Sequence, residues 1–281
     1  MNSENIERSF NPRLAVADYE SYLKNSSKKA KLAETILNGK KNINYGNSDL
    51  QKLDVYYKSN NTNLPIHIFI HGGYWRALDK SYHTHMAIPF VEKKICFFNI
   101  NYDLCPNVKL TEIKKQIIKA IVWIYNNANK FNADNNNIVL SGHSAGAHLV
   151  SLMLNVDWKK YGLIKNYIKG VALISGIYDT EIVTNLSINK EIGLSHKEAI
   201  KNNPFKHKPL LKVPTIISYG ENEPSLWIEQ SYKYMNYLKL CGYNCKKIVC
   251  KNDNHFSLID TLADNTKSIV KEIINLSFTK Q

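Results

Sequence analysis

The hydrophobic residues of this chain fall into two kinds of pattern, short uninterrupted runs and longer stripes with helical spacing. The uninterrupted runs lie at 65–70, 95–100, 138–140, 171–175, 213–219 and 247–250. Runs of this kind are typical of strands in a parallel sheet that helices cover on both faces. Helical stripes lie between them, at 81–93, 110–125, 225–240 and 262–276. The alternation predicts an α/β fold with one doubly wound, mostly parallel sheet.

Three other segments complete this outline. Residues 12–38 carry a helical pattern that ends at Gly39, and two short strands predicted at 42–45 and 53–57 favour a hairpin at a sheet edge. Residues 180–210 contain no strand pattern, and we interpret them as a short-helical insertion that caps a pocket. No repeat or linker interrupts the chain, so we expect residues 1–281 to form a single domain.

Composition and charge narrow the class of protein. The chain has 281 residues, of which 44% are hydrophobic and 22% are charged, as in an ordinary globular protein. No apolar run is long enough to span a bilayer and no signal-peptide pattern is visible, so we expect no membrane partner. The net charge of +13 comes from lysines spread along the chain, which favours a solvated surface over nucleic-acid binding.

The cysteines indicate a reduced, cytoplasmic protein. Five of them are scattered along the chain, at Cys96, Cys105, Cys241, Cys245 and Cys250, and their spacing matches no zinc pattern. Disulfides form mainly in oxidising compartments, so we expect free thiols, a cytoplasmic location and neither a metal nor another cofactor. The oligomeric state stays open, with a homodimer among the alternatives.

A candidate nucleophile lies in Gly142-His143-Ser144-Ala145-Gly146, between an apolar strand and an apolar helix. A serine between two glycines in this context is typical of a nucleophile elbow, a strained turn that lifts the hydroxyl above the sheet. Gly142 and Gly146 are expected to remove side chains where strand and helix would collide. Ala145 N–H, at the start of the helix, is a candidate oxyanion donor.

Three further segments supply the partners that such a serine needs. His71-Gly72-Gly73 follows the strand at 65–70, where the backbone N–H groups of Gly72 and Gly73 are candidate oxyanion donors. His255 follows the last predicted strand and suits a general base, and Glu223 follows the strand before it and can orient that histidine. The order Ser144, Glu223, His255 is the one in which α/β-hydrolases carry their triad.

Other carboxylates compete for the role of the acid. Asp179 follows an earlier strand, from which some enzymes of this kind draw their acid, and Glu221 and Asp253 lie close in sequence to the preferred residues. We prefer Glu223 because it lies further out in its loop, while Asp179 is expected to cap the start of the insertion. His143 and His148, beside the elbow, are interpreted as packing residues.

Together these segments resemble the kynurenine formamidase (arylformamidase) branch of the α/β-hydrolases, in its bacterial form. The resemblance covers most of the chain, and its pieces are FNPRLAVADYE at 10–20, HGGYW at 71–75, NYDLCP at 101–106, GHSAGAHL at 142–149, SGIYD at 175–179, GENEP at 220–224 and NHF at 254–256. HGGYW is similar to the HGGxW motif of that family. The chain departs from animal members in carrying Glu223 where they carry aspartate.

The resemblance implies a serine hydrolase that cleaves an aryl formamide, such as N-formylkynurenine, through a formyl-enzyme. Aromatic residues near the motifs are candidates for a pocket that takes a flat ring: Tyr74, Trp75, Tyr102, Tyr178, Trp227 and Phe256. Two alternatives stay open. One is a carboxylesterase for small acyl or aryl esters that uses the same residues, and the other is a hydrolase-like binding module without catalysis.

Overall fold

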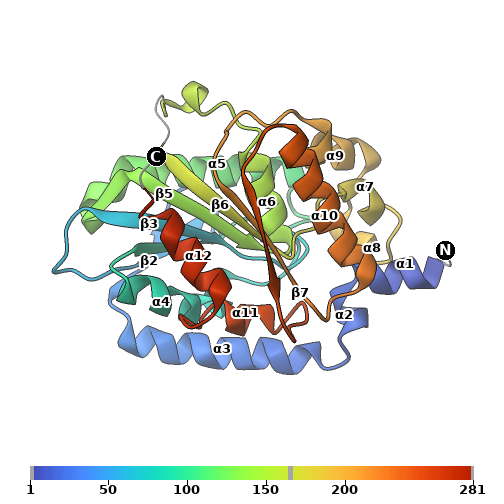
Figure 1. Cartoon of the computed structure of the whole chain (residues 1–281), viewed down its shortest axis with the longest axis horizontal. Helices are drawn as coiled ribbons and strands as arrows, with labels where there is room; N and C mark the ends of the chain where they lie inside the picture. The colour runs from blue at the N-terminus through green and yellow to red at the C-terminus, as the bar shows by residue number, and fades with distance from the viewer. Residues whose placement is uncertain (1–2, 164–166, 280–281) are drawn as a thin grey trace.

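The computed structural model describes residues 3–163 and 167–279, and its centre is one eight-stranded sheet (Figure 1). The strands are β1 (Gly39–Asn44), β2 (Lys52–Tyr56), β3 (Leu64–Ile70), β4 (Cys96–Ile100), β5 (Ala133–His143), β6 (Ile168–Ile174), β7 (Thr215–Gly220) and β8 (Cys245–Cys250). Their order is β1-β2-β4-β3-β5-β6-β7-β8. Strands β3 to β8 run parallel, and the antiparallel pair β1–β2 forms one edge, as the hairpin pattern predicts.

Helices cover both faces of the sheet. They are α1 (Ser3–Phe10), α2 (Pro12–Ala15), α3 (Tyr19–Ile36), α4 (Ala87–Glu92), α5 (Leu110–Asn127), α6 (Ala145–Met153), α7 (Thr180–Val183), α8 (Asn189–Ile192), α9 (His196–Lys201), α10 (Ser225–Leu240), α11 (Leu258–Thr261) and α12 (Ser268–Leu276). Short 3-10 turns are η1 (Lys80–Tyr82), η2 (Thr84–Met86), η3 (Ala128–Phe131), η4 (Trp158–Tyr161) and η5 (Pro204–Lys206).

The two faces of the sheet bury separate apolar cores. On one face, strand residues such as Ile66 and Ile68 pack with α5, α6 and α10. On the other, which faces the viewer in Figure 1, Phe69 and Val139 pack with α4, α11 and α12. Strands buried on both sides carry no polar alternation, so uninterrupted apolar runs mark them. The predicted α/β class is therefore confirmed.

Three predicted helices differ from the structure at their boundaries. The helix expected at 12–38 is broken at Val16, which is extended (φ −116°, ψ 105°), and α3 begins only at Tyr19. The helix expected at 81–93 begins as two 3-10 turns, and only 87–92 is α-helical. The helix expected at 262–276 begins at Ser268, because the Asp264 side chain accepts from Thr266 N–H at 2.8 Å and forms a turn before it.

The segment between β6 and β7 contains α7, α8, α9 and η5 and no strand among its described residues, as predicted for the insertion. Helix α1 lies beside it (Figure 1), where Ser187 N–H donates to a Glu7 carboxylate oxygen at 2.9 Å. The N-terminal helices and the insertion therefore meet at one end of the molecule. Within the described residues, no helix has the length and apolar character needed to cross a membrane.

Candidate active site

The carboxyl ends of the parallel strands meet at one edge of the sheet, and several contribute a loop to the same site. Gly72 follows β3, Ser144 follows β5, and Ser175 follows β6. Glu223 and His255 follow β7 and β8. Ligands of open α/β sheets bind at this edge, because side chains from neighbouring loops converge there.

Ser144 occupies the sharp turn between β5 and α6. Its backbone has φ 56° and ψ −121°, a conformation that residues with side chains rarely adopt. A Cβ at Gly146 would come within 2.0 Å of Ile70 O, and one at Gly142 within 2.4 Å of the Gly146 carbonyl. The predicted reason for the two glycines is thus confirmed. Ala145, the first residue of α6, directly follows the serine and starts the helix with an N–H that has no carbonyl of its own helix to bond.

Ser144, His255 and Glu223 form one chain of hydrogen bonds, and all three are buried. Ser144 Oγ lies 3.0 Å from His255 Nε2, and His255 Nδ1 lies 2.7 Å from Glu223 Oε1. Glu223 Oε2 accepts from Gly220 N–H at 2.8 Å. Because a carboxylate only accepts, Nδ1 carries the proton and the Nε2 lone pair faces the serine hydroxyl. This arrangement can deprotonate Ser144 and stabilise the imidazolium that results.

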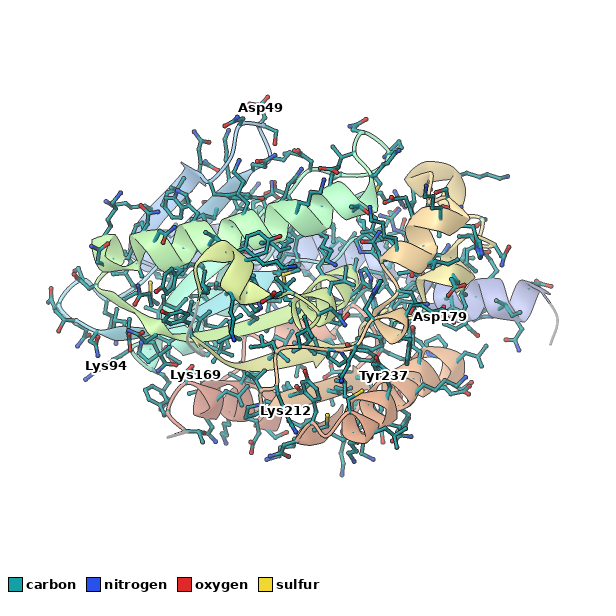
Figure 2. The ribbon with its side chains drawn as sticks, turned by 90° about the horizontal axis from the view of Figure 1, so that it is seen from above. Asp49, Lys94, Lys169, Asp179, Lys212 and Tyr237 are labelled. Carbon is teal, nitrogen blue, oxygen red and sulfur yellow. The ribbon has the colours of Figure 1, made fainter. Side chains whose placement is uncertain are left out.

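The three competing carboxylates have other partners. Asp179 caps the start of α7, as expected, and Figure 2 shows it at the end of the molecule that carries the insertion. Glu221 is exposed and accepts from a backbone N–H of the loop after β8. Asp253 accepts from two hydroxyls that follow it in sequence, at 2.7 Å each. Of these four carboxylates, Glu223 is the one that the structure brings to His255.

Ser175 is a site residue that the sequence analysis missed. Its Oγ donates to Glu223 Oε1, accepts from Trp227 Nε1 at 2.9 Å and lies 2.9 Å from His255 Nδ1. The residue is fully buried, and its φ of 49° lies in the left-handed region. The hydroxyl therefore holds the Glu223 carboxylate beside the imidazole. The signal available in the sequence was its position directly after a strand, at the start of SGIYD.

The loop after β3 lies directly against the nucleophile. Tyr102 donates its hydroxyl to His71 O at 2.7 Å, and His71 Nδ1 lies 2.8 Å from Gly72 O. The C=O and N–H of a trans peptide point in opposite directions, so the N–H groups of Gly72 and Gly73 point away from these two partners. A Cβ at Gly72 would lie 3.0 Å from Ser144 Cβ. This loop can therefore offer N–H donors to an oxyanion formed at the serine.

A pocket enclosing about 780 Å³, its open mouth included, contains Ser144 and His255 in its wall. Much of the wall comes from the N-terminal segment, through Asn11, Pro12, Arg13, Tyr22, Leu23 and Ser26. The loop after β3 adds Gly73, Tyr74, Arg76 and Leu78, and the insertion adds Ile188. The expectation that residues 180–210 cap the pocket is therefore correct only in small part. The break at Val16 turns the chain so that α2 and α3 both face this space.

Two of the six aromatic residues expected in the pocket, Tyr74 and Phe256, line it. The expectation is wrong for Trp75, Tyr102, Tyr178 and Trp227, which are buried in packing outside its wall. Tyr102 and Trp227 brace the loops already described, through their hydrogen bonds to His71 and Ser175. Trp75 donates to a histidine ring, and Tyr178 stacks on another tyrosine with ring centroids 4.4 Å apart. The polar groups of Trp75, Tyr102 and Trp227 have their partners in the protein interior, so these rings face inward.

The two histidines beside the elbow differ in role. His148 donates from Nε2 to Asn202 O at 2.8 Å, and burial lowers its pKa to about 4, so it packs as a neutral residue, as expected. His143 lines the pocket, with its ring centroid 4.7 Å from that of His255. Burial, and then repulsion by a charged His255, hold the pKa of His143 well below its usual value. No group of three or more His, Cys, Asp or Glu side chains suited to a metal ion occurs in residues 3–163 and 167–279.

The chain also resembles known proteins over most of its length. A family model described as BD-FAE matches residues 53–238. The kynurenine formamidase of Salmo salar is 28% identical over 98% of this chain and 97% of its own length. The isoprenylcysteine alpha-carbonyl methylesterase of Arabidopsis thaliana is 23% identical over 86% of this chain and 64% of its own. A Silicibacter sp. TM1040 crystal structure, provisionally described as a thioesterase, matches with TM-score 0.82 and 25% identity, over 98% of this chain and 99% of that one.

Proposed function

This chain belongs to the BD-FAE family, and we propose that it is a serine hydrolase that cleaves aryl formamides such as N-formylkynurenine to formate and the arylamine. The observation that carries the proposal is the buried chain of hydrogen bonds from Ser144 through His255 to Glu223, beside a pocket that Ser144 and His255 line. The similarity to a kynurenine formamidase over nearly the whole chain supports the same substrate class.

In the acylation step, Ser144 Oγ attacks the formyl carbon and His255 Nε2 takes the hydroxyl proton. The carbonyl oxygen becomes an oxyanion, which the N–H groups of Gly72, Gly73 and Ala145 stabilise. An aniline is too basic to leave as an anion, so His255 returns the proton to the nitrogen as the C–N bond breaks. The products of this step are the free arylamine and a formyl ester on Ser144.

Water completes the reaction. His255 takes a proton from the water as its oxygen attacks the formyl ester, and the same N–H groups hold the second oxyanion. When the tetrahedral species collapses, the serine oxygen leaves with the proton from His255, and formate is released. The Glu223 side chain stabilises the imidazolium of His255 in each step.

A carboxylesterase acting on small acyl or aryl esters is the second candidate. The same residues would perform it, and an alcohol is an easier leaving group than an aniline. The similarity to a plant methylesterase favours this alternative. The buried, fully connected Ser144–His255–Glu223 chain argues against a binding module without catalysis, because such a module has no need of it.

The deciding measurement compares kcat/KM for N-formylkynurenine and for phenyl acetate, with Ser144→Ala as the test variant. We expect the variant to lose about 10⁴-fold or more in kcat on both substrates. Ser151→Ala is the matched control, since Ser151 is a buried serine of α6 whose Oγ donates to a helix carbonyl, and it is expected to keep its activity. Phosphonate labelling of Ser144 identifies the nucleophile directly.

Each outcome distinguishes a function. Formamide turnover that disappears in Ser144→Ala supports the proposal. Ester turnover without formamide turnover would assign the protein to the carboxylesterases. Full activity in Ser144→Ala would rule out a serine nucleophile, and no labelling together with no turnover would favour the binding module.

We further propose a cytoplasmic location, which the five free cysteines support because thiols persist in reducing compartments. A homodimer, and the lack of nucleic-acid and membrane partners, stay predictions. Light scattering of the purified protein tests the first, and binding assays with duplex DNA and anionic vesicles test the others.

A further inference from the structure

Arginine is rare in this chain, and two of the three arginines line the pocket. The 37 basic residues are 34 lysines and Arg8, Arg13 and Arg76. Arg13 and Arg76 share the pocket wall with Ser144, and none of the described lysines lines it. A guanidinium presents a planar fork of donors that matches a carboxylate, whereas an ammonium is a compact point charge. The use of arginine here, in a chain that uses lysine almost everywhere else, indicates that the fork itself is needed.

The other titratable groups of the pocket wall do not cancel this charge. Asp260 is the acidic residue among the described lining residues, and Lys29 neutralises it at 2.8 Å. His83 and His143 also line the pocket, and burial holds the pKa of both well below the usual value, so both are neutral near pH 7. Arg76 is paired with Glu191 outside the wall, so the net positive charge beside the nucleophile comes from Arg13.

The two guanidinium groups have donors to spare. Arg76 has a side chain only 10% exposed, and its buried Nε has no hydrogen-bond partner among the described residues. Its Nη1 pairs at 2.7 Å with Glu191, whose side chain is 60% exposed and free to move into solvent. Arg13 lies over the Tyr19 ring at 5.3 Å and makes no ion pair with any described residue. Burying a charged donor such as Arg76 Nε is costly unless an acceptor satisfies it, and an anion in the pocket would do so.

Both arginines are tied to the catalytic loops. Arg76 N–H donates to Gly73 O at 3.1 Å, so one turn carries this guanidinium and a proposed oxyanion donor. The Tyr74 hydroxyl donates to Phe10 O, which holds the N-terminal segment, and with it Arg13, against the same turn. A substrate that binds to the arginines would thus be positioned with its reacting carbon near Ser144.

We propose that Arg13 and Arg76 form a carboxylate-binding subsite, through which the enzyme selects substrates that carry a carboxylate over otherwise similar substrates that do not. The inference rests on the proposed function and deepens it, because it names the second group that a substrate carries. The substrate carboxylate accepts hydrogen bonds from the unpaired N–H groups of Arg76 and Arg13, and it competes with Glu191 for Nη1 of Arg76.

The test uses two matched pairs of substrates that differ only in the carboxylate. One pair is 4-(2-formamidophenyl)-4-oxobutanoate, which is N-formylkynurenine without its α-amino group, and its carboxamide. The other pair is 4-(2-acetoxyphenyl)-4-oxobutanoate and its carboxamide, so in both pairs the carboxylate is on the leaving group. We expect Arg13→Gln and Arg76→Gln each to lower kcat/KM for the anionic member about 10- to 100-fold, chiefly through KM, and to change the neutral member far less. Arg8→Gln is the matched control, since Arg8 is exposed on α1 and outside the pocket wall.

Glu191→Gln supplies a readout that a structural ion pair would not produce. Loss of Glu191 frees Nη1 of Arg76, so KM for the anionic member is expected to fall, whereas a stabilising role alone predicts no gain in affinity. Arg76→Lys keeps the positive charge but not the planar pair of N–H donors. Its kcat/KM for the anionic member is therefore expected to lie between those of Arg76→Gln and the wild-type enzyme.

The inference is overturned if kcat/KM of the wild-type enzyme is no higher for the anionic members than for the neutral ones. It is also overturned if the arginine variants lower kcat/KM equally for both members of a pair. Failure of the proposed function has a different signature. Formamides would then not turn over at all, while the ester pair, with the same five variants, still decides whether the subsite exists.

Discussion

Replacing Glu223 with glutamine removes one negative charge from a buried site and keeps the length of the side chain. Glu223 Oε1 lies 2.7 Å from His255 Nδ1, and its carboxylate accepts two further hydrogen bonds, from Ser175 and from the Gly220 backbone. The glutamine carbonyl oxygen can accept in place of one carboxylate oxygen. We therefore expect Glu223→Gln to fold, and to lose mainly the charge that faces the imidazolium.

The size of the loss follows from the geometry. His255 becomes a cation in the transition state for acylation, and two unit charges 2.7 Å apart attract by about 6 kcal/mol at an effective dielectric constant of about 20. Since about 1.4 kcal/mol corresponds to a factor of ten in rate, this predicts a fall in kcat of about 10⁴-fold. A factor of this size is also typical of a triad acid that is neutralised without a change of shape.

Asp179→Asn is the matched comparison, because it removes the same charge from a carboxylate that also follows a parallel strand. Asp179 caps α7 and accepts from Asn203 Nδ2 at 3.2 Å, so its loss is expected to cost about 1 kcal/mol of stability and to leave kcat within a few-fold. The assay is kcat at saturating N-formylkynurenine for both variants, with thermal unfolding by circular dichroism. A collapse of kcat in Asp179→Asn, with Glu223→Gln near normal, would refute the assignment.

Four further outcomes are expected. Ser175→Ala should lower kcat about 10- to 100-fold with little change in KM, because the Glu223 carboxylate loses its neutral donor; an unchanged kcat would contradict that positioning role. Tyr102→Phe should lower kcat about tenfold in the same assay, since its hydroxyl holds the His71 carbonyl. Burial lowers the pKa of His67 to about 3 and of His148 to about 4, so between those values and about pH 6.5 these histidines bind a proton only in the unfolded protein. The free energy of unfolding should therefore be highest above pH 6.5 and fall toward pH 4, by up to about 1.4 kcal/mol per pH unit for each histidine. Urea unfolding measures this, and equal midpoints at pH 7 and pH 5 would be contrary evidence. EDTA should leave turnover unchanged, and inactivation reversed by added metal would show that the chemistry is not that of a serine nucleophile.

Much of the fold follows from patterns that are local in sequence. An apolar run buried on both faces marks each parallel strand. The stripe of Ile113, Ile117, Ile121 and Ile124 marks α5, and the side chains of this stripe are fully buried. Errors occurred where a side chain or the tertiary context overrides the pattern. The turn formed by Asp264 delays the start of α12, and the extended Val16 separates α2 from α3.

The residues that carry chemistry were found because each directly follows a strand. A parallel sheet aligns the carboxyl ends of its strands, so Ser144, Glu223 and His255 were expected to meet, and the structure brings them within hydrogen-bond distance. Ser175 also follows a strand, yet a lone serine gives no signal of its own. Its importance depends on Trp227 and Glu223, which lie about 50 residues away along the chain.

The sequence by itself determined the α/β class, the strained serine turn and the order of the three central residues, because each depends on a few neighbouring residues and on the geometry that parallel strands share. Only the tertiary structure decided which surfaces enclose the pocket. Arg13 and Arg76 lie 63 positions apart and share its wall, while Trp75, one residue from Arg76, is buried outside it. Side-chain direction and long-range packing set such differences, and neither is written in the spacing of residues along the chain.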